Sequence, residues 1–246
     1  MPRAQGQDLN RFAGPPVFPR GSAAGPAIRR PGGDASRSIA CENLESMAPT
    51  LRATGEPPDY PRELERVVRL TDGSRVRIRP IRPDDTDRLI ELYDRLSRHT
   101  AYHRFFTIMK RLPPDWAQIL ATVDYRRRLA LVAEGGGPGG DDLIGVGRYE
   151  RTEREDTAEV AFVVQDGWQG KGLGTILLHG ILDAAAARGL RRFVAYVLAD
   201  NSRMRALLRR CTDVESEKMA DGVAEVIFRH GGAPSGAEPH RPVSGV

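Results

Sequence analysis

The sequence predicts an α/β protein, with a mixed, mostly antiparallel sheet of six to seven strands and helices on both faces. Three observations predict this fold. Segments in which apolar and polar residues alternate are interspersed with segments of helical period. The loop "GGGPGGDD" separates two strand-like segments, as in a hairpin. The turn "QGKGLG" joins the most apolar strand to a helix.

The first half of the predicted domain is one strand followed by helices. Val76 and Ile78 alternate with arginines in the segment 74–81, which predicts a half-exposed strand. An acidic capping pattern at Asp84 predicts the start of a helix with one apolar face. A short helix and a loop are expected in "YHRFFTIMKRLPP", and Pro114 begins a further helix.

The second half is richer in strands. Strands are predicted at 128–134, 142–151, 157–165, 192–199 and 222–230, and the segment 213–219 is a possible seventh strand. Helices are predicted at 172–188 and 201–210. The strand at 157–165 is the most apolar, so we expect it at the centre of the sheet.

Composition separates the two ends of the chain from one central domain. Residues 1–60 and 231–246 are rich in glycine and proline and contain few apolar residues. Such segments cannot bury enough apolar surface to offset the entropy of ordering, so both ends are expected to be disordered. Residues 61–230 are expected to form the domain.

Several functional classes are disfavoured by the sequence. It has no apolar run long enough for a transmembrane helix and no apolar signal region near its start, which indicates a cytoplasmic protein without a membrane partner. Cys41 and Cys211 are the only cysteines, so neither a disulfide framework nor a metal site is expected. A net charge of +4 without a long basic run argues against a nucleic-acid partner.

The glycine-rich turn is typical of a phosphate-binding site. Without Cβ atoms at Gly170, Gly172 and Gly174, an anion can approach the backbone N–H groups of the first helical turn. A Walker loop is excluded because Lys171 is followed by glycine instead of Ser or Thr. The spacing also departs from the dinucleotide-binding fingerprint. An ordinary glycine turn is the alternative.

The turn resembles a known family. "QGKGLG" fits the Q/R-x-x-G-x-G/A signature of the GNAT superfamily of acyl-CoA-dependent N-acyltransferases, and the order of elements over about residues 70–230 is similar. The stretches "VRIRPIRPDD", "YHRFF", "VDYRRRLALVA" and "VLADNSRM" resemble the Pat-type protein lysine acetyltransferases. This resemblance implies that the central strand splays from the strand at 192–199.

The resemblance also implies acetyl-CoA as the cosubstrate, without a metal. Its pyrophosphate is then expected on the backbone amides of Gln169, Gly170, Lys171, Gly172, Leu173, Gly174 and Thr175. Its pantetheine arm is expected to pair with the backbone of Phe162, Val163 and Val164. Asn201 matches an asparagine that contacts this arm, and a helix N-cap is its structural alternative.

The chemistry requires a base, because a lysine amine with a pKa near 10.4 is protonated at neutral pH. Glu159 shares a strand face with Ala161 and Val163, so burial among apolar neighbours would raise its pKa. The resemblance implies a catalytic glutamate at this position. A glutamate that is exposed or paired with arginine is the alternative reading, and Asp124 and Asp200 are alternative bases.

Two features depart from the family pattern. Many relatives have a tyrosine in the helix after Asn201 that protonates the leaving thiolate, whereas this helix has Leu208 near that place and no tyrosine. The Gly-Phe pair that usually closes the helix is replaced by Cys211 and Thr212. The general acid is therefore left open, while the free N–H near Val164 is the expected donor to the oxyanion.

The sequence thus predicts an acetyl-CoA-dependent N-acetyltransferase that acts on a lysine of a protein such as an acyl-CoA synthetase. "YHRFFTIMKRL" supplies apolar residues for the lysine stem and basic residues for an acidic surface around it. An acetyltransferase for a small amine and a non-catalytic acyl-CoA sensor are the alternatives. The oligomeric state is not predicted.

Overall fold

The computed structural model describes residues 57–136 and 141–231. The expected disordered ends fall almost entirely outside the described residues. The described residues form one mixed sheet in the strand order β1-β2-β3-β4-β5-β6-β8-β7. All neighbouring strands are antiparallel except β5 and β6, which are parallel.

The sheet has eight strands, one more than the upper count expected from the sequence. The strands are β1 Arg66–Arg69, β2 Arg75–Pro80, β3 Arg128–Glu134, β4 Leu143–Arg151, β5 Thr157–Val164, β6 Arg192–Leu198, β7 Asp213–Ala220 and β8 Val223–Arg229. The additional strand is β1, which is only four residues long and pairs with β2 at the edge of the sheet. Its Val67 is 58% exposed, so β1 lacks a buried face that would mark it in the sequence.

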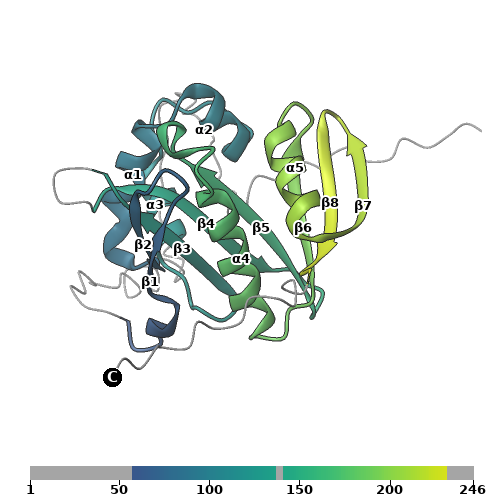
Figure 1. Cartoon of the computed structure of the whole chain (residues 1–246), viewed down its shortest axis with the longest axis horizontal. Helices are drawn as coiled ribbons and strands as arrows, with labels where there is room; N and C mark the ends of the chain where they lie inside the picture. Colours follow the sequence, from purple (N-terminus) through teal and green to yellow (C-terminus); the bar gives the residue numbers. More distant parts are fainter. Residues whose placement is uncertain (1–56, 137–140, 232–246) are drawn as a thin grey trace, which may run out of the picture. The chain divides into compact units, whose positions relative to one another are not determined.

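Helices cover both faces of the sheet, as expected (Figure 1). The helices are α1 Thr86–Asp94, α2 Arg98–Phe105, α3 Pro114–Ala121, α4 Leu173–Ala186 and α5 Ser202–Cys211. The core against one face contains side chains of α4 and α5, and the core against the other face contains side chains of α1, α2 and α3. None of the helices among the described residues has the length and apolar composition needed to cross a membrane.

The folded domain includes Tyr60. This side chain is 7% exposed, and its ring packs edge-on against Tyr125 with the centroids 5.8 Å apart. Its hydroxyl donates to Glu65 at 2.8 Å. The packing of the domain therefore extends one residue beyond the boundary that the composition suggested.

The central strands β5 and β6 are paired only at one end. Their parallel register contains three pairs and ends with Glu159 opposite Val194, although β5 continues to Val164 and β6 to Leu198. Beyond this point the two strands diverge toward α2 and α5 (Figure 1). The expected splay is therefore present, and Glu159 lies where it begins.

Candidate active site

The glycine-rich turn has the backbone conformation of an anion cradle. Gly170 and Gly172 have φ angles of +76° and +89°, in the left-handed region that disfavours side chains. Gly172 is the N-cap of α4, which begins at Leu173. The first N–H groups of a helix have no partners within it, so those of α4 are available to a ligand together with the positive end of the helix dipole.

Lys171, in the same turn, is held by neighbouring side chains. Its ammonium group lies 2.9 Å from the carboxylate of Asp72 and 4.9 Å from the centroid of the Trp168 ring. Its carbonyl accepts a bond from the backbone N–H of Thr71 at 3.1 Å. These contacts join the turn to the loop between β1 and β2 and fix its backbone.

The turn also holds α2 in place. Asp166, in the 3-10 helix η5 Asp166–Trp168, accepts bonds from the hydroxyl groups of Ser97 and Thr100 at 2.7 Å each. Gln169 donates from its side chain to the carbonyl of Val164 at 2.9 Å. The glycine turn, the end of β5 and the first turn of α2 are thus joined by polar side chains.

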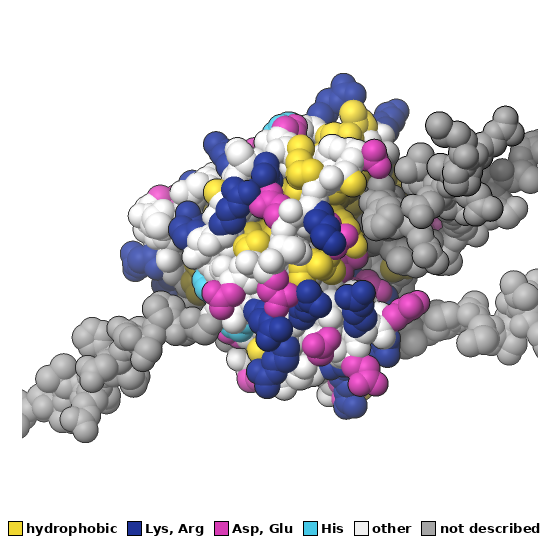
Figure 2. Space-filling model, turned by 90° about the vertical axis from the view of Figure 1, so that its right-hand side faces the viewer, with side chains coloured by type: hydrophobic (Ala, Val, Ile, Leu, Met, Phe, Trp, Pro, Cys, Tyr) yellow, Lys and Arg dark blue, Asp and Glu magenta, His cyan; other side chains and the backbone are white. Residues whose placement is uncertain are grey.

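Two arginines of α5 reach the turn, and sequence reasoning missed both. Arg203 donates to the side chain of Gln169 at 3.3 Å, and Arg210 donates to the hydroxyl of Thr175 at 3.5 Å. They stand seven residues apart, a spacing that places both on one face of a helix and could have revealed them. In Figure 2, which faces the α5 side of the molecule, Lys and Arg side chains mixed with Asp and Glu side chains surround an area of apolar ones. Arg203 and Arg210 therefore place two positive charges beside the turn, where phosphates could accept from them.

Where β6 has diverged, some backbone N–H and C=O groups of β5 have no partner strand. The N–H of Gln165 bonds to the carbonyl of Ile144 on β4, which fixes the alternation of the ladder. In this register the backbone of Val163 faces β4, whereas those of Phe162 and Val164 face the gap. The bond from Gln169 to the Val164 carbonyl agrees with this orientation. Of the three residues expected to pair with a pantetheine arm, Phe162 and Val164 have the backbone groups that can do so.

Glu159 is half-buried at the start of the splay. Burial raises the pKa of its carboxyl above the ordinary value of 4.5, and the negative charge of Glu150 on β4 acts in the same direction. The positive charges of Arg104 and Arg148 oppose this effect without cancelling it. Among the described residues, Glu159 forms no ion pair. This differs from the alternative that the sequence left open, in which the glutamate is paired with an arginine. A carboxyl group with a raised pKa is a stronger base once it is ionised.

Tyr196 on β6 is a further residue that sequence reasoning missed. Parallel pairing puts Val194 on the same face as Glu159, so Tyr196, two residues further, shares that face beyond the last pair. It is 36% exposed, and burial together with Glu225 and Glu159 raises the pKa of its phenol above 10.0. Tyr196 is therefore a neutral hydrogen-bond donor beside the gap at neutral pH.

The other polar residues singled out from the sequence have local partners. Asn201 is the N-cap of α5, because its side chain accepts from the N–H of Met204 at 3.1 Å. Asp124 accepts three backbone N–H bonds, from Arg126, Arg127 and Arg128, which lower its pKa despite partial burial. Asp200 is bonded to His103 of α2 at 3.1 Å. No group of three or more His, Cys, Asp or Glu side chains in the described part of the chain could hold a metal ion.

Diverging central strands, a glycine-rich anion cradle and a carboxyl group at the point of divergence define an acyl-CoA-dependent acyltransferase of the GNAT type. A family model described as an acetyltransferase (GNAT) domain matches residues 75–212, more than half of the chain. The chain therefore belongs to the GNAT acetyltransferase family.

Individual relatives agree with this family. An acetyltransferase of Pseudomonas aeruginosa is 33% identical over 141 residues, which are 57% of this chain and 76% of that protein. Acetyltransferase Pat of Mycolicibacterium smegmatis is 34% identical over 146 residues, or 58% of this chain, but the match spans only 42% of that longer protein. The crystal structure of the GNAT domain of S. lividans PAT has a TM-score of 0.63 and 35% identity, and the match covers 70% of this chain and 99% of that domain.

Proposed function

We propose that this protein is an acetyl-CoA-dependent acetyltransferase that acetylates a lysine side chain of a protein substrate such as an acyl-CoA synthetase. The position of Glu159 supports this proposal most directly. Glu159 is a half-buried carboxyl with a raised pKa, at the point where β5 and β6 separate. A base is needed there, since a thioester held in the gap would lie beside it.

The cosubstrate is expected to occupy the surface that the turn and β5 provide. The pyrophosphate would accept bonds from the N–H groups of residues 169–175, with Arg203 and Arg210 supplying positive charge. The pantetheine arm would pair with the backbone groups of Phe162 and then reach Val164, whose carbonyl also accepts from Gln169, as an added strand does. Asn201 keeps its amide N–H groups available for the arm while its oxygen caps α5.

Acetyl transfer requires a neutral amine, so Glu159 first takes a proton from the lysine ammonium, directly or through water. The C–N bond then forms, the nitrogen loses a second proton to water, and the C–S bond breaks to release the thiolate. The N–H of Val164 faces the gap and can donate to the thioester oxygen as negative charge develops on it. Tyr196 can protonate the thiolate, because its raised pKa keeps the phenol protonated.

Replacing Tyr196 with phenylalanine is expected to lower kcat about tenfold, a modest effect because a thiolate with a pKa near 8.5 also leaves without help. Stopped assays of thiol release under saturating acetyl-CoA measure this effect. Tyr60→Phe removes the hydroxyl that donates to Glu65, outside the proposed site, and is the matched control. An unchanged kcat in Tyr196→Phe would remove Tyr196 from the mechanism.

A protein acceptor is supported by the resemblance to the Pat-type protein lysine acetyltransferases and by the surface around α2. Tyr102 and Ile108 are exposed large side chains there, and Lys110 is exposed beside them. Phe105 is 6% exposed and belongs to the core, so it supports this surface from beneath. Exposed apolar and basic groups suit a protein surface that carries acidic residues around the target lysine.

The proposed acceptor is tested by offering an acyl-CoA synthetase, free lysine and spermidine side by side in a thiol-release assay. We expect the synthetase to have the highest kcat/KM, because small amines forgo binding energy remote from the reacting atoms. The same synthetase with its lysines blocked by reductive methylation is the control and should not react. A higher kcat/KM for spermidine would replace the protein acceptor with a small amine.

A further inference from the structure

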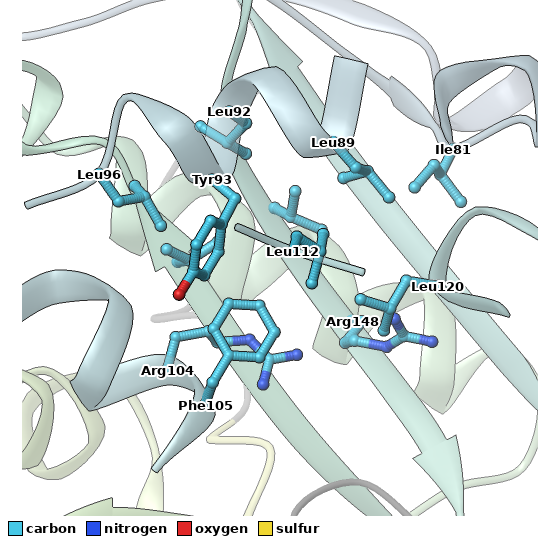
Figure 3. Close-up of a pocket in the computed structure, with 12 residues that line it drawn as sticks. Ile81, Leu89, Leu92, Tyr93, Leu96, Arg104, Phe105, Leu112, Leu120 and Arg148 are labelled. Atoms are coloured by element: carbon cyan, nitrogen blue, oxygen red, sulfur yellow. The ribbon is translucent and has the colours of Figure 1, made fainter. Parts of the chain in front are cut away.

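A pocket lies between helices α1, α2 and α3 and the face of β4 and β5 that they cover. Its empty space is about 430 Å³ when the open solvent at its mouth is included, so the pocket is open to water at one side. Its wall is mostly apolar and includes Leu89, Tyr93, Phe105 and Leu120 (Figure 3). The chemistry proposed above places no ligand in this pocket, although two arginines of its wall act on the pKa of Glu159.

Two arginines, Arg104 of α2 and Arg148 of β4, line the same pocket. Figure 3 shows their guanidinium groups among the apolar side chains. Arg148 is only 8% exposed. Burial lowers the pKa of both groups to about 10, so both stay charged at neutral pH.

Neither guanidinium group has a hydrogen bond or an ion pair with any residue in the described part of the chain. The guanidinium carbon of Arg104, a partly exposed residue, lies 5.0 Å from the centroid of the Phe105 ring. Arg79 is 3% exposed and is held by Asp85 at 2.7 Å and by Glu134 at 2.7 Å. Arg148 is also buried, but it has no such partner among the described residues.

The nearby carboxyl group does not balance the two positive charges. Glu159 interacts electrostatically with both arginines, yet it forms an ion pair with neither and supplies at most one negative charge. Arg104 also lowers the pKa of Arg148, as like charges do. At least one positive charge at the apolar wall is therefore not balanced by a carboxylate of the described residues, and an anion would be attracted to it.

We propose that this pocket, the arginine pocket, binds a carboxylate carried on a short apolar chain. A guanidinium group matches a carboxylate with two parallel hydrogen bonds, and the leucines and aromatic rings can enclose the chain. The ligand would bring the missing negative charge to Arg104 and Arg148. This inference goes beyond the proposed function, which needs no ligand at this place.

The carboxylate can come from two sources. It can belong to a free carboxylic acid, or it can be the terminal carboxylate of a dicarboxylic acyl group on coenzyme A. The second source is sterically reasonable because Val163 lines the pocket and lies on β5 next to the gap. Both sources present the same chemistry to the two arginines, so the experiment has an arm for each.

The first arm is calorimetry of the full chain with hexanoate and with hexanamide, its neutral counterpart. We expect hexanoate to bind, hexanamide to bind at least about tenfold more weakly, and Arg148→Met to weaken hexanoate binding by a similar factor. Arg75→Gln removes a positive charge from an exposed residue of β2 and is the matched control. Arg104→Gln is the second variant, from another element, if Arg148→Met does not fold.

The second arm compares succinyl-CoA with butyryl-CoA, which has no terminal carboxylate. If the acyl group is the source, the kcat/KM of the wild type is at least about tenfold higher for succinyl-CoA than for butyryl-CoA, and Arg148→Met loses this preference. If the free acid is the source, hexanoate binds, and the wild type has the same kcat/KM for the two acyl-CoA compounds. The proposal is overturned if Arg148 and Arg104 affect neither hexanoate binding nor this preference.

The melting temperature without ligand gives an independent readout. Because an unpaired buried charge destabilises a fold, Arg148→Met is expected to melt at a higher temperature than the wild type. A lower melting temperature would show that the guanidinium group stabilises the ligand-free protein, and it would overturn the premise of an unbalanced charge. Hexanoate binding involves no acetyl transfer, so this proposal and the proposed function can fail separately.

Discussion

Replacing Glu159 with glutamine is expected to lower kcat about 10²-fold or more, the usual effect of removing a general base. The affinity for acetyl-CoA should stay close to that of the wild type, because the glycine turn and the free edge of β5 remain intact. Calorimetry with acetyl-CoA and steady-state kinetics on the same samples separate the two quantities. A kcat close to that of the wild type from pH 6 to 9 would place the base elsewhere.

The pH profile tests the same assignment. In the proposed mechanism the ionised form of Glu159 is the active base, so the rate should rise with pH through its pKa, which burial places above 4.5. Glu150→Gln is the matched control, because Glu150 is the cross-strand neighbour of Glu159 and raises its pKa. Removing that negative charge should move the acidic limb to lower pH and leave the plateau unchanged. In Glu159→Gln the acidic limb should disappear.

The structure also explains why the alternative carboxylates are weaker choices. Asp124 uses one oxygen to accept three backbone bonds, and its lowered pKa makes it a poor proton acceptor. The side chain of Asp200 is 68% exposed and is bonded to His103. Only Glu159 combines burial, a raised pKa and a position at the splay.

The sequence predicted most elements because their signals are local. Apolar alternation identified β5, and the glycine turn that follows it identified the start of α4. These features depend on residues that are neighbours in the chain, so no knowledge of the fold was needed. The strand β1 was not predicted because it is only four residues long and largely exposed, and it pairs along the edge of β2.

The missed site residues depend on contacts between distant segments. Tyr196 shares a face with Glu159 only because β5 and β6 run parallel after a crossover through α4. Arg104 and Arg148 line one pocket only because α2 packs on the sheet, and each alone would be interpreted as a surface arginine. Asp166 likewise gains its role from Ser97 and Thr100, nearly seventy residues earlier. Register and packing, rather than composition, determine such groupings.

Replacing Gly172 with aspartate is expected to abolish measurable binding of acetyl-CoA. The new carboxylate would stand at the N-cap of α4, where the pyrophosphate is expected, and would add a like charge there. The loss of two charge-assisted bonds to a phosphate corresponds to roughly 3 kcal/mol or more, at least about a 10²-fold change in Kd. Calorimetry with acetyl-CoA measures this loss.

The fold is expected to tolerate this change, so the loss of binding can be attributed to the site. A Cβ atom at Gly172 would meet only the side chain of Thr71, at an ordinary contact distance of 3.6 Å. The φ angle of +89° is unfavourable for a side chain, but Asp and Asn adopt the left-handed region more readily than most residues and are good N-caps. Gly172→Asn is therefore the matched control, with the same shape and no charge. We expect it to weaken binding less than Gly172→Asp, and equal affinities of folded Gly172→Asp and wild type would refute the phosphate cradle.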